Sequence, residues 1–237
     1  MQIARIKSLH PVTEYTPSWN FPVGVAQWTD TQSIDTIRDW MLAKEQHFIT
    51  TYPIHHDGKT GLGNDSVTAR HGTYNLFHMT DELPEFEKLL EFCQISYIKF
   101  IQEDQTSLRD LHIFSWYNIA RKGNRIEEHA HGADHESYLS GNMHFDDYHT
   151  ANTYSSPFDP RSNVTFKNAK GGLTIFPSCL PHESDVYEDE KPRVSFAFDL
   201  RLSADMYTNK PQSHPFMNAQ IFESLVNKYD IHFSRYG

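Results

Sequence analysis

A chain of 237 residues with 38% hydrophobic and 14% aromatic content can bury a substantial core and does not have the composition of a disordered protein. Its formal charge of −10, with scattered lysines and arginines, argues against a surface that binds long nucleic acid. We find neither a secretory signal pattern nor a membrane-spanning apolar run, so we expect a soluble, cytoplasmic protein. Cys93 and Cys179 lack a CxxC spacing and lie in apolar surroundings, which indicates reduced, buried thiols.

Residues 1–110 are expected to combine edge strands, two helices and a long loop. The fragments IARIK and FPVGVAQW are of β type and lie among prolines, as at a sheet edge. Apolar side chains at helical spacing predict one helix over residues 33–48 with Ser33 as its N-cap, and a second over residues 80–105 with Thr80 as its cap. Residues 52–75 show no periodicity, and we expect a surface loop that covers a site.

From residue 111 the sequence changes to strands separated by turns. The expected strands are LHIFSWYNIA, ESYLSGNMHF, NVTFKN, GGLTIFPS and PRVSFAFDLRL. Helices followed by strands predict a mainly β protein whose barrel or sandwich is buttressed by N-terminal helices. We therefore expect a single domain over residues 1–237, with a core barrel over 111–202 and an extension over 203–237 that carries a helix near 216–229.

The first candidate site is the pair His129 and His131. In an extended strand, residues two apart point to the same side, so both imidazoles could bind one ion. The pair is weak evidence alone, because 15 histidines among 237 residues give roughly one such spacing by chance (15 × 15/237). Two solvated histidines on a rim are the alternative.

A second cluster lies in GGLTIFPSCLPHESDVYEDEKPRVSFAFDL. It places His182 at the start of a strand, and Arg193 begins the next one. In that next strand, alternation puts Arg193, Ser195, Ala197 and Asp199 on one face and bulky apolar residues on the other. The first face has the character of the floor of a polar pocket.

Arg193 is suited to hold a carboxylate. The guanidinium makes two parallel charge-assisted hydrogen bonds, and the hydroxyl of Ser195 can add a third. Because an unpaired buried charge is costly, the alternative is that Arg193 pairs with Asp199 or with an acidic loop residue.

The order WxN, HxH, SG, GGLxxFPSxLxH and RxSxAF resembles the Fe(II)- and 2-oxoglutarate-dependent oxygenases, especially a subgroup of small bacterial and phage proteins. The upstream stretch DGKTGLGNDSVTARHGTYNLF extends the resemblance over roughly residues 57–200. It implies a double-stranded β-helix, a jelly-roll or cupin-like barrel, with a metal at its mouth. It also implies that His129 and His182 are iron ligands and that Arg193 with Ser195 binds 2-oxoglutarate.

The sequence departs from this family at His131, where most members carry Asp or Glu. His131 is a third neutral ligand in our first interpretation, so that the metal ligands are His129, His131 and His182. In a second, His131 is the first ligand and Ala133 leaves a position for a halide, as in the halogenases of the family. In a third, Asp134 supplies a carboxylate from a bulged or ended strand. Imidazole ligands suit zinc as well as iron.

Other polar residues are expected on the strands that flank the site. Trp116 and Asn118 share one strand face, and Asn118 could bind the cofactor or a ligand histidine; the alternative is an ordinary structural role. Ser140, Asn142 and His144 alternate onto one face and are expected to contact substrate or cofactor. The histidines expected in loops without a ligand role are His55, His56, His71, His78, His135 and His149.

The resemblance implies an enzyme that uses Fe(II), 2-oxoglutarate and O2, and most simply a hydroxylase that acts on an unactivated C–H bond and releases succinate and CO2. We expect a small-molecule or peptidyl substrate, and an exposed apolar strand face would favour a homodimer. One alternative is a cupin-like metalloenzyme without 2-oxoglutarate, which has no reason to place Arg-x-Ser after the distal histidine. Another is a non-enzymatic jelly roll, in which His129 and His182 would not converge.

Overall fold

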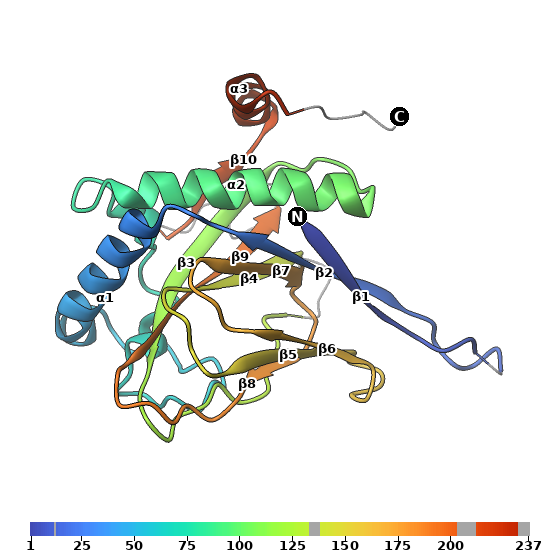
Figure 1. Cartoon of the computed structure of the whole chain (residues 1–237), viewed down its shortest axis with the longest axis horizontal. Coiled ribbons are helices and arrows are strands. Elements are labelled where there is room, and N and C mark those ends of the chain that lie inside the picture. The colour runs from blue at the N-terminus through green and yellow to red at the C-terminus, as the bar shows by residue number, and fades with distance from the viewer. Residues whose placement is uncertain (12, 133–137, 203–211, 232–237) are drawn as a thin grey trace.

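The computed structural model describes the chain except for residues 12, 133–137, 203–211 and 232–237 (Figure 1). Its described strands form two antiparallel sheets, one of seven strands and one of three. Figure 1 shows the smaller sheet below the larger one and helix α2 across the opposite side of the larger sheet. The predicted mainly β architecture with flanking helices is therefore confirmed.

The larger sheet has the order β1-β2-β7-β4-β9-β3-β10. The bounds of its strands in that order are Gln2–Lys7, Asn20–Gln27, Gly172–Pro177, Leu139–His144, Arg193–Leu202, Leu111–Ala120 and His214–Met217. The smaller sheet has the order β6-β5-β8, with bounds Asn163–Lys167, Ala151–Ser155 and His182–Ser184. β1 lies at the edge of the larger sheet, as the prolines near it predict.

Strand β9 is central to the larger sheet because it pairs with β3 on one side and with β4 on the other. Its register places Ser195 directly between Asn118 of β3 and His144 of β4. Phe196 and Phe198, on the opposite face, are fully buried in the main core. Burial of each such side chain contributes roughly 2 kcal/mol. The predicted alternation of β9 is confirmed, and it gives the sheet one apolar face and one polar face.

The apolar face of the sheet shares its core with two helices, α1 (Thr31–Thr51) and α2 (Glu85–Asp104). The predicted N-caps of both helices are wrong. Asp30 caps α1, and its carboxylate accepts from the backbone N–H of Ser33, which lies inside the helix. Helix α2 begins after Pro84, whose φ of −60° already suits a helix, so no side chain caps it.

Several other boundaries differ from those predicted. β5 was not expected, because its sequence ANTYS is short and polar; it is held between β6 and β8. The C-terminal helix α3 spans Ala219–Tyr229 and follows the unpredicted strand β10. The predicted surface loop 52–75 contains the buried 3-10 turn η1 (Val67–Arg70), and a second turn, η2, spans Leu76–His78. Cys93 is buried, but Cys179 is only half-buried.

Residues from α1, α2, β3 and β9 lie in one core cluster, which supports our proposal that 1–110 and 111–202 form one domain. In the part of the chain that the structure describes, no helix has the length and apolar content needed to cross a bilayer.

Candidate metal centre

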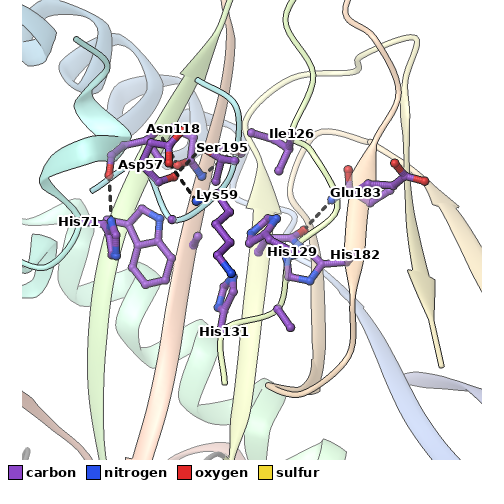
Figure 2. Close-up of a pocket in the computed structure, with 18 of the residues that line it drawn as sticks. Asp57, Lys59, His71, Asn118, Ile126, His129, His131, His182, Glu183 and Ser195 are labelled. Atoms are coloured by element: carbon purple, nitrogen blue, oxygen red, sulfur yellow. Dashed lines mark hydrogen bonds between the residues drawn. The ribbon is translucent and has the colours of Figure 1, made fainter. Parts of the chain in front are cut away.

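The histidines His129, His131 and His182 converge and line one cavity (Figure 2). His129 and His182 are opposite each other in an antiparallel bridge, with N–H to carbonyl distances of 3.1 and 2.9 Å. Opposed residues of such a pair project to the same side, and His131 follows two residues later. One ring nitrogen from each imidazole lies within 4.8 Å of the others. The structure thus brings together two segments that are far apart in the sequence.

Each of the three imidazoles has its Nδ1 atom bound to an oxygen that can only accept. The contacts are His129 to the Glu127 carbonyl at 2.7 Å, His182 to the Leu180 carbonyl at 3.1 Å, and His131 to the Asp199 carboxylate at 2.6 Å. Each Nδ1 must therefore donate, so each neutral ring keeps its lone pair on Nε2. The three Nε2 atoms are left available to a cation.

The charge state of the cluster suits metal binding. Burial, with a smaller effect of the neighbouring His131, lowers the pKa of His129 to about 4. Burial, together with the adjacent His129 and His131, also holds the pKa of His182 well below its ordinary value. Imidazoles bind metals in the neutral form, so neither ring has to lose a proton near neutral pH. Asp134 and Ala133, on which the alternative ligand sets depend, lie outside the described residues.

Arg193 lies in the same cavity and is 2% exposed. Its guanidinium donates to the hydroxyls of Ser184 at 2.8 Å and Thr150 at 3.3 Å, and lies over the Tyr187 ring at 5.6 Å. In the described part of the chain no carboxylate forms an ion pair with it, and Asp199 contacts His131 instead. The guanidinium of Arg193 is thus a buried charge without an acidic partner among the described residues, and such a group favours an anionic ligand.

The remaining predicted site residues lie around the three histidines and the guanidinium of Arg193. Trp116, Asn118, Asn142, His144 and Ser195 all line the cavity. Asn118 donates to the Ser195 hydroxyl at 3.5 Å and accepts from the Thr68 hydroxyl at 2.8 Å. His144 is buried beside Arg193, and its Nδ1 has no hydrogen-bond partner among the described residues. Burial and the charge of Arg193 lower the pKa of His144 to about 3, so its ring is neutral.

The cavity has a volume of about 760 Å³, and its outer wall comes from the predicted loop. The residues of this segment that line it are His56, Lys59, Thr68 and His71. The loop is attached to the segment that carries the histidines, because Glu127 donates its backbone N–H to the Thr60 carbonyl at 2.9 Å.

Residues 114–199 match the family model described as "Putative 2OG-Fe(II) oxygenase". The resemblance to the 2OG-Fe(II) oxygenases is confirmed. The match contains the three converging histidines and Arg193, and it supports Fe(II), 2-oxoglutarate and O2 as the cofactors and co-substrates. No curated protein sequence matches the chain.

Solved structures share the fold. EvdO2 from Micromonospora carbonacea var. aurantiaca has a TM-score of 0.52 at 14% identity, covering 83% of this chain and 92% of its own. The α-ketoglutarate-dependent carbocyclase SnoK from nogalamycin biosynthesis has a TM-score of 0.51 at 8% identity, covering 83% and 89%. The epimerase SnoN from the same biosynthesis has a TM-score of 0.51 at 10% identity, covering 83% of this chain and 88% of its own. At these identities the likeness establishes the double-stranded β-helix, whereas the reaction is not transferable.

Two residues of this site were missed by the sequence analysis. The carboxylate of Asp199 accepts from His131 and also from the Ser140 hydroxyl at 2.6 Å. Ser140 consequently supports Asp199 and is not among the residues that line the cavity. Strand alternation placed Asp199 on the polar face, but the partner lies 68 residues away in the sequence. Lys59 extends from its loop into the cavity toward His131 (Figure 2), and no pattern in the sequence marks it.

Proposed function

We propose that this oxygenase hydroxylates an unactivated C–H bond of a small-molecule or peptidyl substrate, and converts 2-oxoglutarate and O2 to succinate and CO2. One observation carries the proposal. Three imidazoles, each held through Nδ1 by an oxygen acceptor so that Nε2 is left for a cation, share a cavity with a buried guanidinium that has no acidic partner among the described residues. A cation and a dicarboxylate would satisfy these two features together.

His129, His131 and His182 are the proposed iron ligands. Nitrogen donors of this kind suit Fe(II), and three protein ligands leave coordination positions for a bidentate 2-oxo acid. When bound, the iron centre supplies the activation of dioxygen. The protein contributes the fixed orientation of the imidazoles, through the oxygen atom that accepts from each Nδ1.

The His131–Asp199 pair is proposed to replace the carboxylate ligand of most family members. Three imidazoles bring no negative charge to a divalent cation. Asp199 supplies one negative charge behind the ring of His131, through a 2.6 Å hydrogen bond. Burial alone would raise the pKa of Asp199, but the neighbouring His131 and the hydrogen bonds lower it, so the carboxylate stays ionised.

Arg193 is proposed to bind the distal carboxylate of 2-oxoglutarate. The Ser184 and Thr150 hydroxyls hold the guanidinium in place, and neither neutralises it. Ser195, two residues further along the same strand face, can donate a hydroxyl hydrogen bond to the same carboxylate. Because Arg193 is 2% exposed, water competes weakly for this interaction. Trp116 and Asn142, on the cavity wall, are proposed to contact substrate.

The function is tested first with the wild-type protein. Anaerobic addition of Fe(II) and 2-oxoglutarate should give a weak visible charge-transfer band, and admission of air should release succinate. The band reports a 2-oxo acid that chelates iron, and the succinate reports turnover. Absence of both, in protein shown to be folded, would refute the proposal.

The Arg193→Ala variant tests the anchor of the co-substrate. Loss of a buried charge partner costs about 2–5 kcal/mol, so we expect the KM for 2-oxoglutarate to rise by roughly 30-fold or more. Binding of Fe(II) alone should be retained. Arg161→Ala is the matched control, because Arg161 is an exposed arginine paired with Asp159. An unchanged KM in Arg193→Ala would show that the anchor lies elsewhere.

A further inference from the structure

A second histidine cluster lies at the mouth of the cavity. It consists of His55, His56 and His71, and we refer to it as the mouth cluster. One ring nitrogen from each lies within 4.8 Å of the others, as in the first cluster. The distances between ring centroids are 4.1, 4.7 and 5.1 Å here, against 4.4, 5.0 and 5.3 Å in the first cluster. The two sets of imidazoles are spaced almost alike.

We propose that the mouth cluster binds a second divalent transition metal ion, and specifically zinc. Neutral imidazole nitrogens suit zinc, and three protein ligands leave a fourth tetrahedral position open. This site is separate from the proposed iron centre, and its occupancy does not depend on the proposed function.

The backbone holds the three residues together. His55 donates its N–H to the Ala69 carbonyl at 2.8 Å, which joins the two parts of the loop that supply the imidazoles. Gly72 leaves room for the ring of His55, since a Cβ atom there would lie 2.8 Å from the Nδ1 of His55. The loop is thus shaped so that the His55 ring lies against the chain next to His71.

The hydrogen bonds of two of the rings identify the nitrogen that carries the lone pair. His71 contacts the Thr68 carbonyl through Nδ1 at 3.0 Å, so Nδ1 donates and Nε2 keeps its lone pair (Figure 2). His56 accepts from the Gly58 N–H through Nδ1 at 3.0 Å, so its lone pair is on Nδ1. Histidine binds metals through either nitrogen, and a zinc ion at His56 would replace this one acceptor contact.

The position of the mouth cluster gives such an ion access to the cavity. His56 and His71 both line it. The ring of His71 lies 5.4 Å from that of Trp116, whose ring lies 5.5 Å from His131 on the other side. The two clusters are therefore separated by one indole. A zinc ion here would present its open position to a molecule that enters the cavity.

Zinc titration by calorimetry, with metal content measured in parallel, tests the proposal. We expect two zinc ions per wild-type chain and one in His56→Ala/His71→Ala. His129→Ala/His182→Ala should retain one ion, at the mouth cluster. His149→Ala, which removes an exposed loop histidine, should still bind two. Circular dichroism checks that each variant is folded. If His129→Ala/His182→Ala does not fold, the zinc content of His56→Ala/His71→Ala is sufficient to test the proposal.

Gly72→Ala provides a sharper variant, because it keeps every imidazole and displaces His55. We expect the affinity of the mouth cluster for zinc to fall by roughly 10-fold or more, with the other site unchanged. One zinc ion in the wild type that persists in His56→Ala/His71→Ala would overturn the proposal, and so would unchanged mouth affinity in Gly72→Ala. Neither result would bear on the iron centre, which the charge-transfer band tests separately.

Discussion

The two histidine clusters have similar spacing but are held in place by different contacts. We refer to His129, His131 and His182 as the barrel cluster, to distinguish them from the mouth cluster. In the barrel cluster each Nδ1 contacts an oxygen acceptor, and two of the residues face each other across a β-bridge. In the mouth cluster all three residues belong to one loop segment, and His55 and His56 are exposed. Spacing alone therefore does not distinguish the two, whereas the β-bridge and the deeper burial of the barrel cluster do. We expect the barrel cluster to bind metal more tightly, because its rings lose less freedom on binding.

The largest expected effect is from His182→Ala. His182 is 6% exposed and supplies the ligand from the second segment. We expect Fe(II) affinity to fall at least roughly 100-fold and succinate release to be lost, because only two imidazoles remain. Anaerobic equilibrium dialysis measures the affinity, and His56→Ala is the control from the other cluster. Iron affinity equal to that of the wild type would contradict the assignment of this ligand.

A smaller effect is expected from Asp199→Asn, which keeps the shape of the side chain and removes its charge. Outer partners of metal ligands contribute about 10- to 100-fold in affinity, so Fe(II) binding should weaken by that factor. Zinc binding at the mouth cluster should change less, since Asp199 is hydrogen-bonded to His131 and acts on His71 only through its charge. Asp35→Asn, on the surface of α1, is the control. Equal losses at both clusters would point to a general change of structure.

The smallest expected effect concerns pH and His144. Its pKa is lowered from 6.5 to about 3 by burial and by Arg193. Between these values the unfolded chain takes up a proton that the folded protein does not, so stability falls as pH falls below about 6.5. Above that pH the residue adds no pH dependence. Chemical denaturation of metal-free protein at pH 7 and pH 5 should show a smaller loss for His144→Gln than for the wild type, with His149→Gln unchanged. Equal losses in all three would contradict this.

Sequence patterns predicted the elements that depend on strict periodicity. Alternation in β9 correctly separated Arg193 and Ser195 from Phe196 and Phe198. The alternation is a reliable guide here because β9 is buried on both faces. A shift by one residue would move its polar side chains to the apolar face and its apolar side chains to the polar face. Helices α1 and α2 were located but their caps were not, since a cap is a local contact such as that of Asp30 with Ser33.

What the sequence could not predict depends on contacts between distant segments. The pairing of His131 with Asp199 is of this kind, and so is the position of Lys59. Lys59 has a φ of +63°, a conformation that follows from its loop and not from its residue type. The strand β5 is another case, because its polar residues pair with β6 and β8 and show no apolar pattern of their own.

The most direct test of the central claim is anomalous diffraction at the iron edge from crystals of the anaerobic complex with Fe(II) and 2-oxoglutarate. We predict one iron bound to the Nε2 atoms of His129, His131 and His182, with the distal carboxylate of 2-oxoglutarate on Arg193. Iron bound by Asp134 in place of His131, or a co-substrate carboxylate away from Arg193, would contradict it.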